Sequence, residues 1–242
     1  MTPVAHSPRG EVPAQAYREH IENVRQQAVG KAQFATTKYT GDRTAFIDAV
    51  ETAAIYHDLG KLDEVNQEVL RRESNDPLPV AHEDAGVAEL LKLRRRESAV
   101  LVAAHHAGLF SQEAEICKER SKRGRAFRNP KVADQIDKQL ENYVALHSAA
   151  GCPTPGWIES GILHKCGFTR RVALSCLVDA DHSDTARHYG NEVRHDQPEP
   201  RWYERLASLD QYVARLPEGS TERERHRNYL STVRNKYAAG LT

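Results

Sequence analysis

Cysteine is scarce in this chain. Only four of the 242 residues are Cys, and no C-x-x-C pair occurs among them. Structural zinc knots are built from closely spaced pairs of that kind, so the spacing argues against one here. In a reducing compartment we expect the thiols to be small buried hydrophobic side chains without a functional role.

Long apolar runs are missing as well. No stretch approaches the roughly 18 apolar residues that a membrane span requires. The N-terminus from Met1 to His6 has no basic stretch leading into an apolar segment, so a secretory signal is not expected. We therefore predict a cytoplasmic protein with no membrane partner.

Net charge is absent too, since 34 basic residues balance 34 acidic ones. The molecule therefore lacks the overall positive field that is typical of a dedicated duplex-DNA binder. One local basic stretch runs from Lys118 to Lys131, with Phe127 as a candidate base-stacking platform. The candidate nucleic-acid-binding residues in it are Lys122, Arg123, Arg125 and Arg128. The alternative is a solvated loop, because charge runs are usually solvated surface.

No convincing strand alternation appears, whereas helical periodicity runs through most of the chain. One apolar stripe consists of Tyr17, Ile21, Val24, Ala28 and Ala32. Similar patterns predict helices over 85–95, 98–106, 132–147 and 170–189. We therefore predict an all-α helical bundle over residues 1–195. A polar, Pro-containing linker and a helical appendage that starts at Trp202 are expected over 196–242.

A His-Asp pair lies at the end of another predicted helix, whose apolar positions are Phe46, Val50, Ala53 and Ala54. His57 continues the inward face formed by Val50, Ala53 and Ala54, and Asp58 follows directly. An isolated buried histidine is usually just hydrogen-bonded in the core. A buried carboxylate is costly unless it is paired or binds a metal, so Asp58 favours a metal site.

Further candidate ligands end or flank other apolar segments. His105 and His106 end an apolar helix, and Asp179 lies on the flank of another, where a surface salt bridge is its alternative role. His82 opens a helix and has an ordinary capping position as its alternative. A second His-Asp dipeptide, at residues 195 and 196, has no apolar periodicity and no Gly-Lys after it. We interpret that second dipeptide as chance.

Adjacent His and Asp side chains do not readily bind one ion tetrahedrally, but they suit two neighbouring ions, with the carboxylate as the bridge. The pattern therefore indicates a two-metal phosphodiester hydrolase. Imidazole-rich sites favour manganese, iron, cobalt or nickel over an all-oxygen magnesium cage. His147 and His164 are substitutes if a ligand is misassigned, although a structural role is expected for both.

The order of these motifs resembles the HD superfamily and, within it, the HD nuclease of type I CRISPR systems. The resemblance covers most of the chain and rests on AHSPRG, YREHI, YHDLGKL, HEDAG, AAHHAGL and LVDADHSDT. It implies a helical bundle with a dinuclear site holding two divalent ions (Mn, Fe, Co, Ni or Mg). The implied metal-binding set is His20, His57, Asp58, His82, His105, His106 and Asp179. Asp58 would bridge the ions, and Lys61 would support catalysis or touch a phosphate.

The resemblance also implies cleavage of single-stranded DNA in antiviral defence, together with a helicase and a CRISPR RNA-guided surveillance complex. No G-x-x-x-x-G-K-[ST] motif occurs, so the helicase would act in trans or lie elsewhere in the same full-length chain. Asn66-Gln67 departs from the family pattern after the HD motif, which affects the expected substrate channel. Alternatives are an HD phosphohydrolase of small nucleotides and a non-catalytic interaction scaffold.

Overall fold

Helices make up most of the computed structural model, which describes residues 2–74, 76–120, 124–156, 167–191, 202–218 and 220–239. The chain divides into one unit over Met1–Val193 and another over Arg194–Thr242, whereas the sequence places this boundary between residues 195 and 196. None of the described helices is long and apolar enough to cross a bilayer. The prediction of an all-α fold class is confirmed, since the described elements are helices apart from two short strands.

The first unit starts with a short antiparallel hairpin of β1 (Val4–His6) and β2 (Gln15–Ala16). Its helical elements are α1 (Tyr17–Ala35), α2 (Arg43–Tyr56), the 3-10 helix η1 (Leu59–Leu62), α3 (Glu64–Leu70), α4 (Glu83–Lys92), α5 (Arg96–Ala104), α6 (Gln112–Arg120), α7 (Ala133–Ala149) and α8 (Gly167–His188). The hairpin, η1, α3 and α6 were not predicted. Strands of two and three residues are too short to show an alternating pattern.

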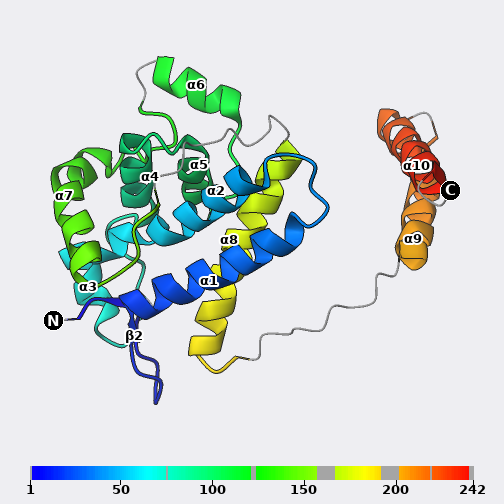
Figure 1. Cartoon of the computed structure of the whole chain (residues 1–242). Helices are drawn as coiled ribbons and strands as arrows, with labels where there is room; N and C mark the ends of the chain where they lie inside the picture. The colour runs from blue at the N-terminus through cyan, green and yellow to red at the C-terminus, as the bar shows by residue number, and fades with distance from the viewer. Residues whose placement is uncertain are drawn as a thin grey trace. The chain divides into compact units, whose positions relative to one another are not determined.

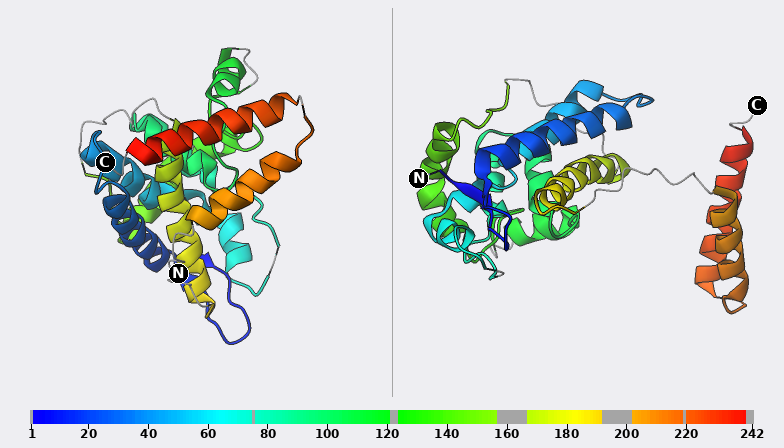
Figure 2. Two further views of the ribbon diagram at one scale, coloured as in Figure 1. Left: turned by 90° about the vertical axis from the view of Figure 1, so that its right-hand side faces the viewer. Right: turned by 90° about the horizontal axis from the view of Figure 1, so that it is seen from below.

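Helix α1 packs along α2 and α8, and α4 packs against α5 and α7 (Figures 1 and 2). The predicted apolar stripe of α1 is fully buried, and His20 lies within that buried face. Because α2 also packs on α5, the C-terminal ends of these two helices are brought together. His57 and His105 follow those ends directly.

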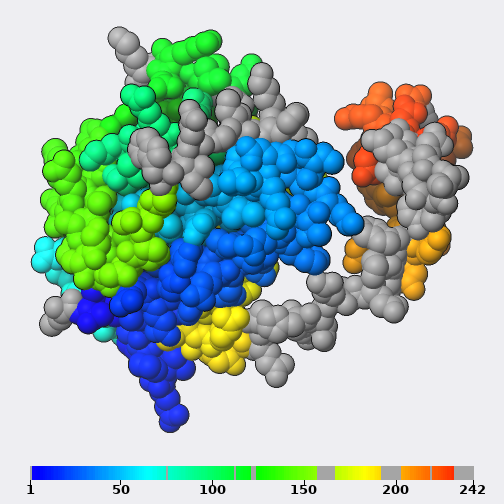
Figure 3. All heavy atoms as spheres, viewed as in Figure 1, coloured from blue at the N-terminus to red at the C-terminus, as the bar shows by residue number. Residues whose placement is uncertain are grey.

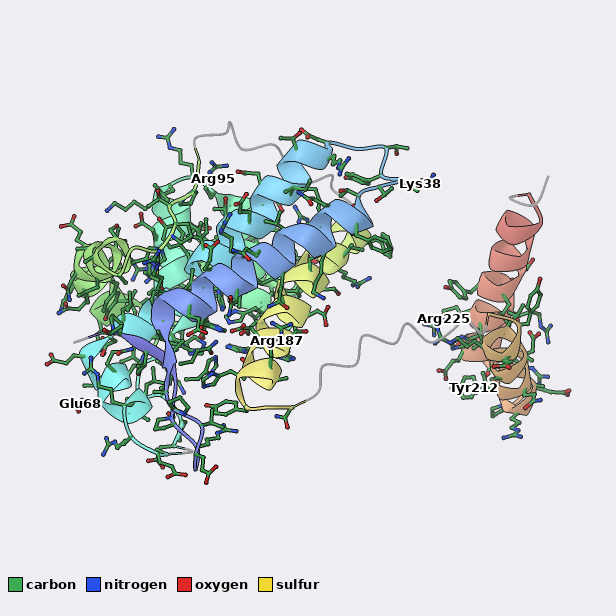
Figure 4. All side chains as sticks on the ribbon, turned by 60° about the horizontal axis from the view of Figure 1, so that its bottom comes forward. Lys38, Glu68, Arg95, Arg187, Tyr212 and Arg225 are labelled. Atoms are coloured by element: carbon green, nitrogen blue, oxygen red, sulfur yellow. The ribbon has the colours of Figure 1, made fainter. Side chains whose placement is uncertain are left out.

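A buried ion pair joins α2 to the start of α5. The guanidinium of Arg95, labelled in Figure 4, donates to Asp48 on α2 at 2.6 Å. Buried pairs of this kind strongly destabilise a fold when one partner is removed. This contact therefore helps to fix the two helices that carry His57 and His105.

The connection within the β1–β2 hairpin protrudes from the surface of this unit (Figure 3). Its base is held to the body, because the Gln67 side-chain amide donates to the carbonyl of Val4 at 2.8 Å and its oxygen accepts from the Val4 amide at 3.0 Å. This contact places β1, and therefore His6, next to the turn that follows α2.

The second unit contains α9 (Trp202–Arg215) and α10 (Thr221–Ala239). Val213 of α9 and Leu230 of α10 are buried, and the rings of Tyr212 and His226 meet edge to face with centroids 6.0 Å apart. Tyr212 on α9 and Arg225 on α10 are labelled in Figure 4. A helix starting at Trp202 was predicted from the sequence.

Candidate metal centre

The end of α2 carries the His-Asp pair into the interior. His57 is the residue that ends the helix, and its Nδ1 donates to the carbonyl of Ala54 at 2.8 Å. This bond leaves Nε2 on the other side of the ring, where it lies 3.3 Å from His20 Nε2. Asp58 follows at the start of η1, and its side chain is only 2% exposed.

The Asp58 carboxylate faces imidazoles on two sides. Its Oδ2 lies 3.1 Å from His20 Nε2 and 3.4 Å from His57 Nε2. Its Oδ1 lies 3.3 Å from His82 Nε2. Lys61 Nζ approaches Oδ2 at 2.7 Å. Asp58 therefore stands between two groups of nitrogen ligands, as expected for a bridging carboxylate.

The first group, which we name the buried half, consists of His20, His57 and Asp181. Asp181 lies on α8, with Oδ1 at 3.4 Å from His20 Nε2 and 3.8 Å from His57 Nε2. His20 Nδ1 donates to Asp184 at 2.8 Å, and Asp184 also accepts from Gln15 and Asn23. A carboxylate behind an imidazole is the usual support of a metal-binding histidine, because it fixes both the tautomer and the ring orientation.

The second group, the open half, consists of His82, His105 and His106. His105 Nδ1 donates to the carbonyl of Val102 at 2.6 Å. Its Nε2 is buried and has no hydrogen-bond partner among the described residues. His82 Nε2 and His106 Nε2 lie 2.8 Å apart, and His106 is exposed. A buried nitrogen without a partner is unfavourable in the protein alone, and a cation bound there would remove that penalty.

Close backbone approaches bring His82 to the His-Asp turn. Gly60 donates to the carbonyl of His82 at 3.0 Å, and a Cβ on Gly60 would come within 2.5 Å of that oxygen. Asn66 completes the connection: its Nδ2 donates to the carbonyls of Gly60 and Val80, both at 2.9 Å, and its Oδ1 accepts from the Val80 amide at 3.0 Å. From the sequence, Asn66 was noted only as a departure from a family pattern.

Burial and neighbouring charges set the protonation of these groups. Burial lowers the pKa of His82 to about 3 and the pKa of His105 to about 4, so both imidazoles are neutral at pH 7. Burial opposes protonation of His20 as well, but the carboxylates of Asp181, Asp184 and Asp58 outweigh it and raise its pKa to about 10. Burial would raise the pKa of Asp58, yet the charge of Lys61, the nearby ring of His57 and the hydrogen bond from His20 hold it well below its usual value.

The donor set fits divalent cations. Lone pairs and carboxylate oxygens converge here within hydrogen-bonding distance, an arrangement that only protons or cations stabilise. The ligand atoms of three sets lie close enough for a metal ion: His20, His57 and Asp58; His6, His20 and Asp181; and His82, His105 and His106. Mixed imidazole and carboxylate ligands suit transition metals. Six of the seven predicted metal ligands converge in these groups, and Lys61 lies beside them.

The seventh predicted ligand, Asp179, belongs to none of these three sets. Its side chain is 62% exposed and forms an ion pair with Lys31 on α1. Asp181 is the α8 carboxylate that joins the cluster. Two positions along a helix correspond to a rotation of about 200°, so Asp179 and Asp181 point in nearly opposite directions. The α8 carboxylate that lies beside the cluster is therefore Asp181, whereas the predicted ligand Asp179 faces away from it.

His6 and Asp184 also belong to the site and were missed as ligands or supports. Burial lowers the pKa of His6 to about 2, and its ring centroid lies 4.7 Å from that of His20. His6 belongs to the AHSPRG motif and Asp184 to the LVDADHSDT motif. These two motifs were the sequence features that could have identified them. By contrast, His147 bonds to Tyr17 and to the carbonyl of Pro153, each at 3.0 Å, which is a structural role. His164 lies outside the described residues.

Two of the candidate nucleic-acid-binding residues, Arg125 and Arg128, pair with carboxylates in the structure. Arg128 is buried and bonds to Asp84 through Nε and Nη2 at 2.9 and 2.7 Å. Arg125 pairs with Asp134 at 3.0 Å and with Asp137. Because the donors of Arg128 are already used inside the fold, the structure argues against the predicted contact of this residue with nucleic acid. Lys122 and Arg123 lie outside the described residues.

No family model, curated protein or solved structure matches this chain. The chemistry of the cluster is therefore inferred from its own side chains.

Proposed function

We propose that this chain is a metal-dependent phosphodiester hydrolase of the HD type, with two divalent ions held on either side of Asp58. The observation that carries the proposal is the Asp58 carboxylate, whose Oδ2 faces the buried half while its Oδ1 faces the open half. Ions bound by these residues would activate a water molecule and neutralise charge on the phosphate.

The protein's own side chains supply the rest of the catalytic arrangement. Asp58 holds the two halves together, while Asp184 and the Ala54 carbonyl keep the Nε2 atoms of His20 and His57 directed at the cluster. Lys61 places a positive charge 2.7 Å from Asp58 Oδ2. A lysine ammonium at this position can hydrogen-bond a phosphate oxygen of the substrate.

Single-stranded DNA is the substrate that we propose, within CRISPR interference and with a helicase and an RNA-guided surveillance complex as partners. The order of the sequence motifs supports this setting. The exposure of His106 supports a polymeric substrate, because an open site admits a strand that continues beyond it. An HD phosphohydrolase of small nucleotides would instead be expected to enclose its substrate.

The test uses the full chain, stripped with a chelator and reloaded with Mn, Co, Ni, Fe or Mg. Labelled single-stranded DNA, duplex DNA and deoxynucleoside triphosphates are assayed side by side. We expect cleavage of the single strand by the reloaded protein and none by the stripped protein. Faster hydrolysis of the triphosphates would favour the small-nucleotide alternative.

Asp58→Ala should abolish cleavage while the helical circular dichroism spectrum is retained. Asp196→Ala, in the second His-Asp dipeptide, is the matched control and should cleave like the unmodified chain. Cleavage by the Asp58→Ala variant at the unmodified rate would refute the assignment.

A further inference from the structure

A groove of about 540 Å³ opens next to His105 and His106 and runs along α8. Ligand-binding pockets typically enclose about 300–1,000 Å³, so the groove is large enough to receive a small ligand. The α8 side chains that line it are Leu174, Ser175, Val178, Asp179 and His182. Their spacing places them on one stripe of the helix.

The lining of this groove does not suit a phosphate. Among the described residues that line it, none is Lys or Arg. The carboxylate there, Asp179, is paired with Lys31 from outside the groove. Phosphate groups in proteins are held by cations or by clustered donors, and at this site the cations are provided by Lys61 and by the proposed metal ions.

The groove does suit the uncharged part of a nucleotide. Leu174 and Val178 give it an apolar wall, whereas Ser175, Asp179 and His182 offer hydrogen-bonding groups along the same stripe. A nucleoside has apolar ring faces together with hydroxyl and amino groups, so it matches both features. Because His105 and His106 line the groove as well, a group bound there is adjacent to the open half.

We propose that this groove receives the sugar and base of the nucleotide next to the scissile phosphodiester, with Ser175 and Asp179 as its polar partners. This proposal rests on the proposed hydrolase function. It gives Asp179 a role in substrate binding in place of metal binding.

Two chromogenic diesters distinguish the contribution of the groove to catalysis from that of the metal centre. Thymidine 5′-(4-nitrophenyl) phosphate carries a nucleoside, and methyl 4-nitrophenyl phosphate carries only a methyl group in its place. In both reactions water adds to phosphorus, the bond to the aryl oxygen breaks, and 4-nitrophenolate leaves. The ratio of the two kcat/KM values therefore reports the contribution of the nucleoside.

Ser175→Phe fills the groove from an exposed position of α8. We expect it to lower kcat/KM for the thymidine diester by at least about tenfold, chiefly through KM, and to change the methyl diester by less than about threefold. Asp179→Asn should act in the same direction and leave the metal content unchanged. Arg171→Phe, at another exposed position of α8 that does not line this groove, is the control and should leave the ratio unchanged.

An equal loss on both diesters, or no loss on either, would overturn the groove proposal while leaving the hydrolase intact. If the unmodified, metal-loaded chain hydrolyses neither diester, the proposed function fails and the groove proposal fails with it.

Discussion

The two halves of the candidate centre are held in different ways. In the buried half, each imidazole has its Nδ1 tied down, His57 by the Ala54 carbonyl and His20 by Asp184. In the open half, His105 is held in the same way by the Val102 carbonyl, whereas His82 lies at the start of α4 and His106 is exposed. Tightly oriented ligands retain an ion, whereas an accessible site exchanges ligands with solvent and substrate. The comparison suggests that the buried half anchors the centre and the open half meets the substrate.

The largest expected effect comes from removing the carboxylate of the buried half. Asp181→Asn should lower phosphodiesterase activity by about a thousandfold or more, and metal content should fall by at least one ion per chain, because a charged ligand is lost. Plasma mass spectrometry and the chromogenic assay measure both. Asp179→Asn, two residues earlier on α8, should keep its full metal content. Equal metal loss in the two variants would contradict the proposal that Asp181, and not Asp179, binds metal.

The open half depends on Asn66, which joins the turn after α2 to the segment before His82. Asn66→Ala leaves the Val80 amide and two carbonyls without their side-chain partner, so the free energy of unfolding should fall by about 1–3 kcal/mol. Ser74→Ala, which removes an exposed hydrogen bond to Asp76, should change it by less than about 0.5 kcal/mol. Urea denaturation compares the two variants. Equal stabilities would show that the amide does not hold the open half in place.

Protonation should also distinguish the halves. His20, with a pKa of about 10 in the metal-free site, carries a proton at pH 7.5 that a metal must displace. His82 and His105, with pKa values of about 3 and 4, carry none. Apparent metal affinity should therefore rise about tenfold per pH unit from pH 7 toward pH 10. About one proton should leave His20 when the metal binds. Calorimetry in buffers of different ionisation enthalpy counts the protons. A flat affinity above pH 7 would contradict this account.

The same raised pKa has a consequence for the metal-free fold. A folded-state pKa above the unfolded value gives His20 a stabilising contribution that is complete below about pH 6.5, the unfolded pKa of histidine. That contribution is lost as the pH rises toward about 10. His82 and His105 act in the opposite sense, because their neutral forms are favoured by folding. They destabilise the fold only when the pH falls below about 6.5.

The smallest expected effect is the change in the free energy of unfolding when the exposed imidazole of His106 is removed. His106→Ala should change the free energy of unfolding of the metal-free protein by less than about 0.5 kcal/mol. His57→Ala removes a fully buried, hydrogen-bonded ring and should cost about 1–3 kcal/mol or more. Thermal and urea unfolding measure both variants. A larger loss for His106→Ala than for His57→Ala would reverse the assignment of the anchored and accessible halves.

Much of the bundle could be predicted from the sequence, because strong apolar periodicity leaves little choice of helix face. The α1 stripe is an example, since every predicted member is buried. Periodicity also placed His57 on an inward face. It could not distinguish Asp179 from Asp181, because α8 has a less regular apolar pattern, and one or two positions decide which side of a helix a carboxylate occupies.

Long-range contacts account for the rest. His6 lies on a short strand that Gln67 holds against the body, and no local pattern indicates that its ring meets His20. Arg128 was predicted as a surface residue because it belongs to a basic run. Its partner Asp84 lies 44 positions earlier in the chain, and an ion pair over that separation is visible only once the fold is known.

The most direct test of the central claim is anomalous scattering from crystals of the chain loaded with manganese, recorded at the manganese edge. Two peaks should appear on opposite sides of the Asp58 carboxylate, one bound by His20, His57 and Asp181 and the other by His82, His105 and His106. A map with no peak at Asp58, or with manganese bound at Asp179 in place of Asp181, would contradict the proposed dinuclear centre.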